Sequence, residues 1–316
     1  MYLGDARDTA LDSTKEAEFL ATWHILSEGC TKAGTPLIMQ INRPGRQSRL
    51  GRRNPRLGRV GTPREMSQAD ITTVIQQFVD CSRLACAAGL QGVQIRAAHG
   101  YLLAEFLSPK TNQRTDRYGG SAEGRAQIVT EIVRGIREAV PATFCVGIRL
   151  NSVYHQSRET LAACVKQLKM IVAAGIDFVE ISGGTYEDPQ MMQAAAEPQK
   201  EKSSRTLARE AFFLKFASAI RHEIPDVPLL VTGGFRSRRG LAAAINDNAC
   251  DLVGLGRPAV LHPDLPKSVL LNDKVPDDEA VFPTKLIQPP WFMKRSGKWY
   301  SKHIQEIGRQ ASVASA

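Results

Sequence analysis

The sequence of 316 residues lacks long hydrophobic runs. No window approaches the stretch of about 18 apolar residues that a membrane-spanning helix needs. Residues 1–8 contain neither the basic cluster nor the apolar core of a signal peptide. We therefore expect a cytoplasmic protein with no membrane partner. Hydrophobic residues make up 43% and charged residues 23% of the chain, which is enough for a large packed core.

Aromatic residues are scarce, at 6%, although the net charge is +9. The excess positive charge comes from one stretch, residues 43–64, which holds eight arginines and no acid. Without these eight, 33 basic residues (41 minus 8) face 32 acidic ones. Proteins that bind nucleic acid usually spread basic residues over one face and interleave stacking aromatics. We therefore expect no nucleic-acid partner and interpret the stretch as a solvated loop, with a phosphate-facing loop as the alternative.

Cys-x-x-Cys pairs are absent, and none of the six cysteines has a histidine nearby at the spacing typical of a metal site. This absence predicts reduced, buried thiols rather than a zinc site or a disulfide framework. The Gly-x-Gly-x-x-Gly fingerprint of a dinucleotide-binding fold is also missing after every predicted strand. We expect no metal ion and no fold of that class.

Short apolar, strand-like runs alternate with helical patterns along the chain. Their uniform hydrophobicity is typical of a parallel sheet covered by helices. One helix is predicted to start at Ser121, a good N-cap residue, and another to end at Gly175. The predicted strands are 36–41, 92–96, 144–150, 177–182, 228–232 and 251–255, and the predicted helices are 14–34, 68–89, 121–140, 158–174, 206–223 and 238–247.

Polar residues decide between an open doubly wound sheet and a (β/α)8 barrel. They fall at or just beyond the carboxyl ends of the predicted strands, which share one rim in a barrel, and barrels build their active sites at this rim. We therefore predict an α/β fold of the (β/α)8 (TIM) barrel class, N-terminally incomplete, with about six parallel strands visible. Residues 1–270 would form the barrel and 271–316 an extension packed on it. The polar rim residues are Gln40, Arg96, His99, Arg149, Gly183, Gly184, Gly233, Gly234, Gly256 and Arg257.

Two stretches of the sequence carry a family resemblance. Residues 39–48 read MQINRPGRQS, and residues 92–121 contain GVQIRAAHGYLL and NQRTDRYGGS. The runs VGIRLN, TGGF and GLGRP follow in the same order. Together these motifs resemble the old yellow enzyme family, the FMN-dependent ene-reductases also called NADH:flavin oxidoreductases, from about residue 15 to residue 310.

The resemblance implies an enzyme that uses NAD(P)H to reduce the C=C bond of an α,β-unsaturated carbonyl compound. Such a reaction needs a hydride donor on one face of the double bond, a proton donor on the other, and hydrogen-bond donors at the carbonyl oxygen. By family analogy Tyr101 is the proton donor and His99 donates to the substrate oxygen. Tyr101 and His99 are thus the predicted catalytic residues, and Arg96 and His99 the predicted substrate-binding residues.

The cofactor implied by the resemblance is FMN. Its ring needs a cation near N1 and O2 and an amide at the pyrimidine edge, and Arg149 and Gln40 match these roles. Arg149 has no acidic residue nearby in sequence, and a buried arginine without a partner is otherwise costly. Barrels commonly bind phosphate after their last two strands. The resemblance therefore places the phosphate of FMN on the backbone N–H groups of Gly234, Phe235 and Gly256, with the side chain of Arg257 as counter-charge.

Arg96 departs from the family pattern, in which a histidine is typical at this position. Arginine still donates hydrogen bonds, but it is permanently charged, and its planar fork suits a carboxylate or a phosphate. We hypothesise that substrate selection has shifted toward an anionic or more polar group, or that reduction is impaired.

Two alternative functions stay open, because the family's first strand, with its flavin contacts, has no counterpart in the sequence. One is a flavin-independent double-bond isomerase that keeps Tyr101 and His99 on the same barrel. The other is a truncated, non-catalytic member of the family. The sequence is also compatible with a homo-oligomer.

Overall fold

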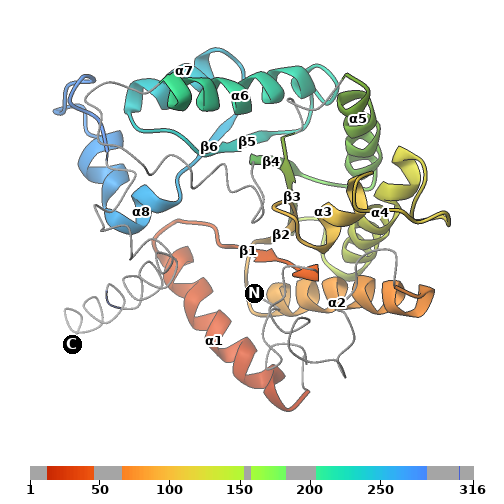
Figure 1. Cartoon of the computed structure of the whole chain (residues 1–316). Helices are drawn as coiled ribbons and strands as arrows, with labels where there is room; N and C mark the ends of the chain where they lie inside the picture. Colours follow the sequence, from red (N-terminus) through yellow and green to blue (C-terminus); the bar gives the residue numbers. More distant parts are fainter. Residues whose placement is uncertain (1–12, 46–65, 153–157, 183–203, 283–305, 307–316) are drawn as a thin grey trace, which may run out of the picture.

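A six-stranded parallel sheet forms the centre of the protein, as a computed structural model shows (Figure 1). The structure describes residues 13–45, 66–152, 158–182, 204–282 and Glu306, with the side chains of residues 13–15, 158–159 and 204–212 left aside. The strands follow one another in sequence order across the sheet, and each pairs in parallel with the next. They are β1 (Ile38–Ile41), β2 (Gly92–Ala97), β3 (Cys145–Asn151), β4 (Phe178–Ser182), β5 (Leu229–Thr232) and β6 (Leu252–Gly254).

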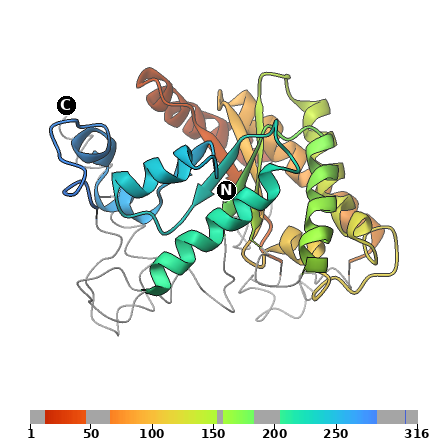
Figure 2. The same ribbon diagram turned by 90° about the horizontal axis from the view of Figure 1, so that it is seen from above.

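Helices lie along the outer side of this sheet, as two perpendicular views show (Figures 1 and 2). The second helix contacts β1 and β2, whereas the sixth and seventh contact β5 and β6 respectively. The six parallel strands, with helices along their outer side, form a half-barrel in the part of the chain that the structure describes (Figure 1). The helices are α1 (Ser13–Lys32), α2 (Gln68–Ala87), α3 (Leu102–Leu107), α4 (Ala122–Ala139), α5 (Arg158–Ala173), α6 (Ser204–Arg221), α7 (Arg238–Asn246) and α8 (Arg257–Leu261), and a π-helical turn, η5, spans Pro266–Leu270.

Local capping explains where the long helices begin and end. The Ser67 hydroxyl accepts a hydrogen bond from the backbone N–H of Asp70, whose carboxylate accepts one from the N–H of Ser67, so a capping box starts α2. The Ser121 hydroxyl accepts from the N–H of Gly124 and starts α4, as predicted. Gly175 follows α5 with φ of +111°, a backbone conformation that favours glycine.

The core lies between the strands and the helices that cover them. Apolar side chains of α2 and α4, such as Ile71 and Ile132, are fully buried in one core cluster with side chains of the strands. Gly147 in β3 has a specific reason to be glycine, because a Cβ there would lie 2.1 Å from a ring carbon of Phe178 in β4. The missing side chain makes room for the aromatic ring.

The amino ends of the strands are held together by a repeated device. Asp177, just before β4, accepts the backbone N–H of Val146 in β3 at 2.7 Å and pairs with Arg137 of α4. Asp251, just before β6, accepts the N–H of Leu229 in β5 at 2.7 Å and pairs with Arg221 of α6. One carboxylate therefore links β3 to α4, and the other links β5 to α6, the helix before each strand.

The predicted fold class is confirmed, since six parallel strands alternate with helices as in an incomplete (β/α)8 barrel. Strand and helix boundaries differ from the predicted ones by one to a few residues. The prediction missed the short helices α3 and α8 and the turn η5, because runs of five or six residues show no clear periodicity. Among the described residues, no helix combines the length and hydropathy needed to cross a bilayer.

The division into a barrel and a C-terminal extension stays a prediction. Residues 271–282 of the predicted extension contact the barrel through Arg238 of α7, whose guanidinium donates to the backbone carbonyls of Asn272 and Val275 at 2.8 Å. Residues 283–316, apart from Glu306, lie outside the described residues.

Candidate functional site

The carboxyl ends of β1 to β4 gather the polar side chains of the predicted site. The register aligns Arg96 of β2 with Arg149 of β3, and Arg149 with Glu180 of β4. Alternate residues of a strand share a face, so Gln94 lies on the same face of β2 as Arg96. The side chains on this inner face are within hydrogen-bond distance of one another.

A chain of contacts joins side chains of four strands, β1 to β4, through Glu180, which is only 6% exposed. One carboxylate oxygen of Glu180 lies 3.3 Å from the guanidinium of Arg149. Its other oxygen accepts a hydrogen bond from the Gln94 amide at 2.7 Å. Gln94 in turn accepts from the amide of Gln40 at 2.6 Å. Glu180 therefore positions both predicted ring-binding residues, Arg149 directly and Gln40 through Gln94.

Arg96 is held by three neighbours. Its Nη1 donates to Oε1 of Gln40 at 3.0 Å, and its Nη2 donates to Nδ1 of His99 at 2.9 Å. The guanidinium carbon lies 4.2 Å from the centre of the Tyr101 ring, within the range of a cation–π contact. The structure therefore brings together all four residues that were predicted near the substrate and the pyrimidine edge of the ring.

His99 has a constrained backbone as well as a constrained ring. Its φ of +61° is unusual for a residue other than glycine, and the carboxamide oxygen of Asn151 accepts its backbone N–H at 3.1 Å. Its Nε2 lies 3.1 Å from the hydroxyl oxygen of Ser182. Because arginine can only donate, Nδ1 must be the acceptor, and the single proton of a neutral imidazole is on Nε2.

The imidazole of His99 is neutral in this environment. Burial lowers its pKa to about 3, and the positive charges of Arg149 and Arg96 act in the same direction. A neutral His99 with its N–H directed at Ser182 positions Arg96. The predicted role of His99 as a donor to the substrate oxygen stays a prediction, because the proton on Nε2 is directed at the hydroxyl oxygen of Ser182.

Buried donor atoms suggest where a ligand would lie. The Nε atoms of Arg96 and Arg149 are both inaccessible to solvent and have no hydrogen-bond partner among the residues that the structure describes. Burial also lowers the pKa of Arg149, while Glu180 acts in the opposite direction. Such donors fit a planar heterocycle that presents carbonyl oxygens and ring nitrogens, so the residues present are compatible with an isoalloxazine ring.

The predicted phosphate-binding residues follow β5 and β6. Gly233 and Gly234 have φ of +123° and +88°, and Phe235 after them is buried. Gly256 is exposed and precedes α8, and a Cβ there would meet nothing within 4 Å. The exposed Arg257 begins that helix. These positions lie at the same edge of the sheet as the arginines, because parallel strands end on one side.

Sequence reasoning missed four residues that the structure places in the site. The partner of Arg149 is the clearest case, because its carboxylate comes from the next strand rather than from nearby sequence. A signal was present: a polar residue inside an apolar strand, two positions from another polar residue, marks a face that is not pure core. The missed residues are Gln94, Asn151, Glu180 and Ser182.

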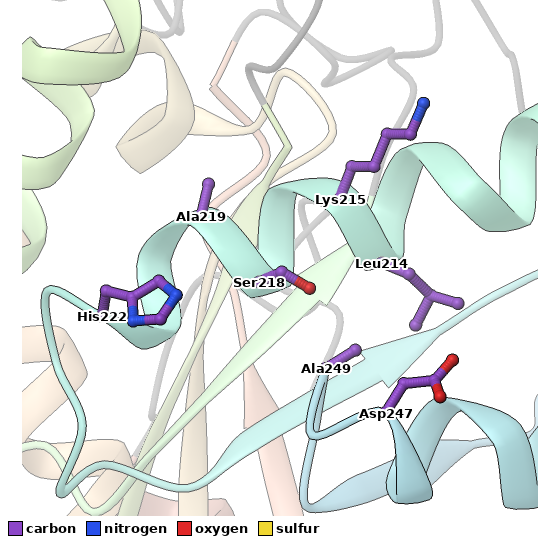
Figure 3. Close-up of a pocket in the computed structure, with 7 residues that line it drawn as sticks. All are labelled: Leu214, Lys215, Ser218, Ala219, His222, Asp247 and Ala249. Carbon is purple, nitrogen blue, oxygen red and sulfur yellow. The ribbon is translucent and has the colours of Figure 1, made fainter.

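Several other sequence features contribute nothing to the described site. Arg43 donates to the side chain of Gln77, and the remaining seven arginines of the basic stretch lie outside the described residues, as do Gly183 and Gly184. An open hollow between the carboxyl-terminal half of α6 and the segment that leads into β6 is lined by Leu214, His222 and Asp247, among others (Figure 3). It lies toward the amino ends of the strands and therefore away from the polar cluster.

Comparisons with known proteins agree with this geometry. The sequence model of the NADH:flavin oxidoreductase / NADH oxidase family matches residues 18–274. NADH-dependent flavin oxidoreductase iliE of Hypocrea jecorina is 41% identical over 94% of this chain and 80% of its own length.

Solved structures give the same result at the level of the fold. An old yellow enzyme homologue from Zymomonas mobilis superposes with a TM-score of 0.63 at 20% identity, over 86% of this chain and 76% of that one. A 2-naphthoyl-CoA reductase in complex with 2-naphthoyl-CoA superposes with a TM-score of 0.57 at 29% identity, over 69% of this chain. The chain spans only 31% of that reductase.

Proposed function

Because this chain belongs to the NADH:flavin oxidoreductase / NADH oxidase family of enzymes, we propose that it reduces the C=C bond of an α,β-unsaturated carbonyl compound with NAD(P)H and FMN. The observation that carries the proposal is the convergence of Gln40, Arg96 and Arg149 on one buried network at the strand ends. Two of these residues hold buried donor atoms that no described residue satisfies.

Residues near the carboxyl ends of β1 and β3 and residues that follow β5 and β6 would together hold FMN. Arg149 would meet the N1 and O2 edge of the ring with its Nε and Nη groups, and Gln40 would meet the pyrimidine edge. Backbone N–H groups of Gly234, Phe235 and Gly256 would bind the phosphate, with Arg257 as its counter-charge. Bound FMN supplies hydride transfer from NAD(P)H to the substrate.

The side chains of β2 and the turn after it would act on the substrate. Arg96 donates hydrogen bonds to the oxygen on which negative charge develops. Tyr101 delivers a proton from its hydroxyl to the carbon next to the carbonyl. The tyrosine is 1% exposed, so its proton is shielded from bulk water. His99 fixes the orientation of Arg96 and remains uncharged while the reaction proceeds.

Purified protein tests this proposal. We expect a yellow preparation whose visible absorption decreases when NADH or NADPH is added under anaerobic conditions, and which consumes NAD(P)H when 2-cyclohexenone is supplied. A colourless protein that shifts a double bond without NAD(P)H would instead support the isomerase. A colourless and inert protein would support the non-catalytic alternative.

A further inference from the structure

The polar network contains more positive than negative charge. Arg96 and Arg149 are register partners on adjacent strands. Among the described residues, the carboxylate of Glu180 contacts Arg149 but not Arg96, and both of its oxygens are engaged. One of its oxygens pairs with Arg149 and the other accepts from Gln94. Glu180 therefore compensates Arg149 and leaves the charge of Arg96 without a counter-ion in the described part of the chain.

The other partners of Arg96 are all neutral. Gln40 contributes an amide oxygen, His99 an uncharged imidazole nitrogen, and Tyr101 the face of its ring. A guanidinium has five N–H donors in a fixed plane, and these contacts use two of them. The Nε donor is buried and has no partner among the described residues. Arg96 is thus held rigidly, and the donors that these contacts leave for a ligand are the second N–H groups of Nη1 and Nη2 rather than the buried Nε.

A partly buried charge without a counter-ion is costly, so the network favours a ligand that brings a negative charge. The planar fork of arginine matches the two oxygens of a carboxylate, and such charge-assisted pairs are stronger than hydrogen bonds between neutral groups. A neutral ketone or aldehyde would accept hydrogen bonds from Arg96 but would not compensate its charge.

We propose that Arg96 is a specificity-determining residue that binds a carboxylate conjugated to the reducible double bond, so that the substrate class is α,β-unsaturated carboxylic acids in their ionised form. This inference rests on the proposed function. Pairing with Arg96 withdraws charge from the carboxylate and makes the β-carbon a better hydride acceptor. NAD(P)H supplies the hydride to that carbon, and Tyr101 supplies the proton to the α-carbon.

Calorimetric titration of the FMN-loaded protein with benzoate and benzamide tests the inference, because these probes share a shape and differ in charge. We expect benzoate to bind about tenfold to a hundredfold more tightly than benzamide, the range of a charged hydrogen-bonded contact. Arg96→Gln should abolish the preference, Arg96→Lys should retain only part of it, and Arg134→Gln, which removes an exposed arginine of α4, should leave it unchanged.

Equal affinity for the two probes in the wild-type protein would overturn the inference, and so would a preference that persists in Arg96→Gln. Loss of FMN from Arg96→Gln alone would assign the arginine to the cofactor and would also overturn it. The FMN content of each preparation, read from visible absorbance, tests the proposed function separately. In a wild-type protein that binds no FMN the same titrations still decide the inference, and circular dichroism verifies that each variant is folded.

Discussion

The two parts of the half-barrel end their strands in different ways. Strands β1 to β4 carry long polar side chains near their carboxyl ends that contact one another across the sheet, whereas glycines follow β5 and β6. Side chains present donors at defined points, which suits the edges of a planar ring. Glycine exposes backbone N–H groups, which suits a phosphate. In the proposed FMN site, one rim would therefore carry two kinds of recognition.

The amino ends of the strands show no such contrast. Asp177 in the first part and Asp251 in the second make the same contacts, each with a neighbouring strand and with an arginine of the helix that precedes that strand. In barrels the amino-terminal face serves stability and the carboxyl-terminal face serves function. The two parts therefore share their stabilising device and differ where a ligand would bind.

The largest effect is expected from breaking the side-chain network of the first part. Arg149→Met leaves the carboxylate of Glu180 buried without its cation, so the free energy of unfolding should fall by about 3–5 kcal/mol. Urea unfolding measures this loss. The double variant Arg149→Met with Glu180→Leu removes both charges and should recover most of the stability; a double variant as unstable as the single one would contradict the pairing.

A smaller loss is expected inside the sheet of the first part. Gly147→Ala places a Cβ 2.1 Å from the Phe178 ring, so the aromatic side chain must move, and overpacking of this kind costs about 1–3 kcal/mol. Phe178→Leu should relieve the clash. If Gly147→Ala unfolded at the same urea concentration as the wild type, the close packing of β3 on β4 would be wrong.

Acid should lower the free energy of unfolding through His99, a residue of the first part. Its folded pKa of about 3 lies below the unfolded value of about 6.5, so below pH 6.5 the unfolded chain binds a proton that the folded chain does not. Stability is therefore complete above about pH 6.5 and decreases toward pH 3, with a loss of about 2 kcal/mol at pH 5.

Urea unfolding at pH 7.5 and pH 5 measures this dependence in the wild type and in His99→Gln. The variant should lose that part of the pH dependence, whereas His262→Gln, which replaces an exposed histidine, should keep it. A pH dependence that is identical in His99→Gln and in the wild type would show that His99 is not the group responsible.

In the second part, the stability lost on substitution should depend on the backbone conformation of the glycine that is replaced. Gly234→Ala places a Cβ at φ of +88° and should cost about 1–2 kcal/mol. Gly256→Ala, at φ of −93° with open space around it, should cost about 0.5 kcal/mol or less. Thermal unfolding compares the two variants, and a larger loss for Gly256→Ala would contradict the assigned backbone roles.

The sequence predicted the fold well, because strand runs and helix caps are local signals. Ser121 starts a helix as expected, and Gly175 follows the end of one. The rim residues were also predictable, since polar groups after apolar strands mark the carboxyl edge. The pairing of those groups was not, because Glu180 reaches Arg149 across the sheet from a position 31 residues later in the chain (180 minus 149). The ring tautomer of His99 likewise depends on Arg96 and Ser182, and only their positions in space determine it.

Titration of the purified, FMN-free protein with FMN, followed by quenching of flavin fluorescence, tests the central claim most directly. We predict saturation at one FMN per chain, with affinity reduced at least tenfold both by Arg149→Lys at the side-chain end of the rim and by Gly234→Ala at the glycine end. Binding that neither variant weakens, or no saturable binding at all, would contradict the claim that the two ends of the rim hold one cofactor.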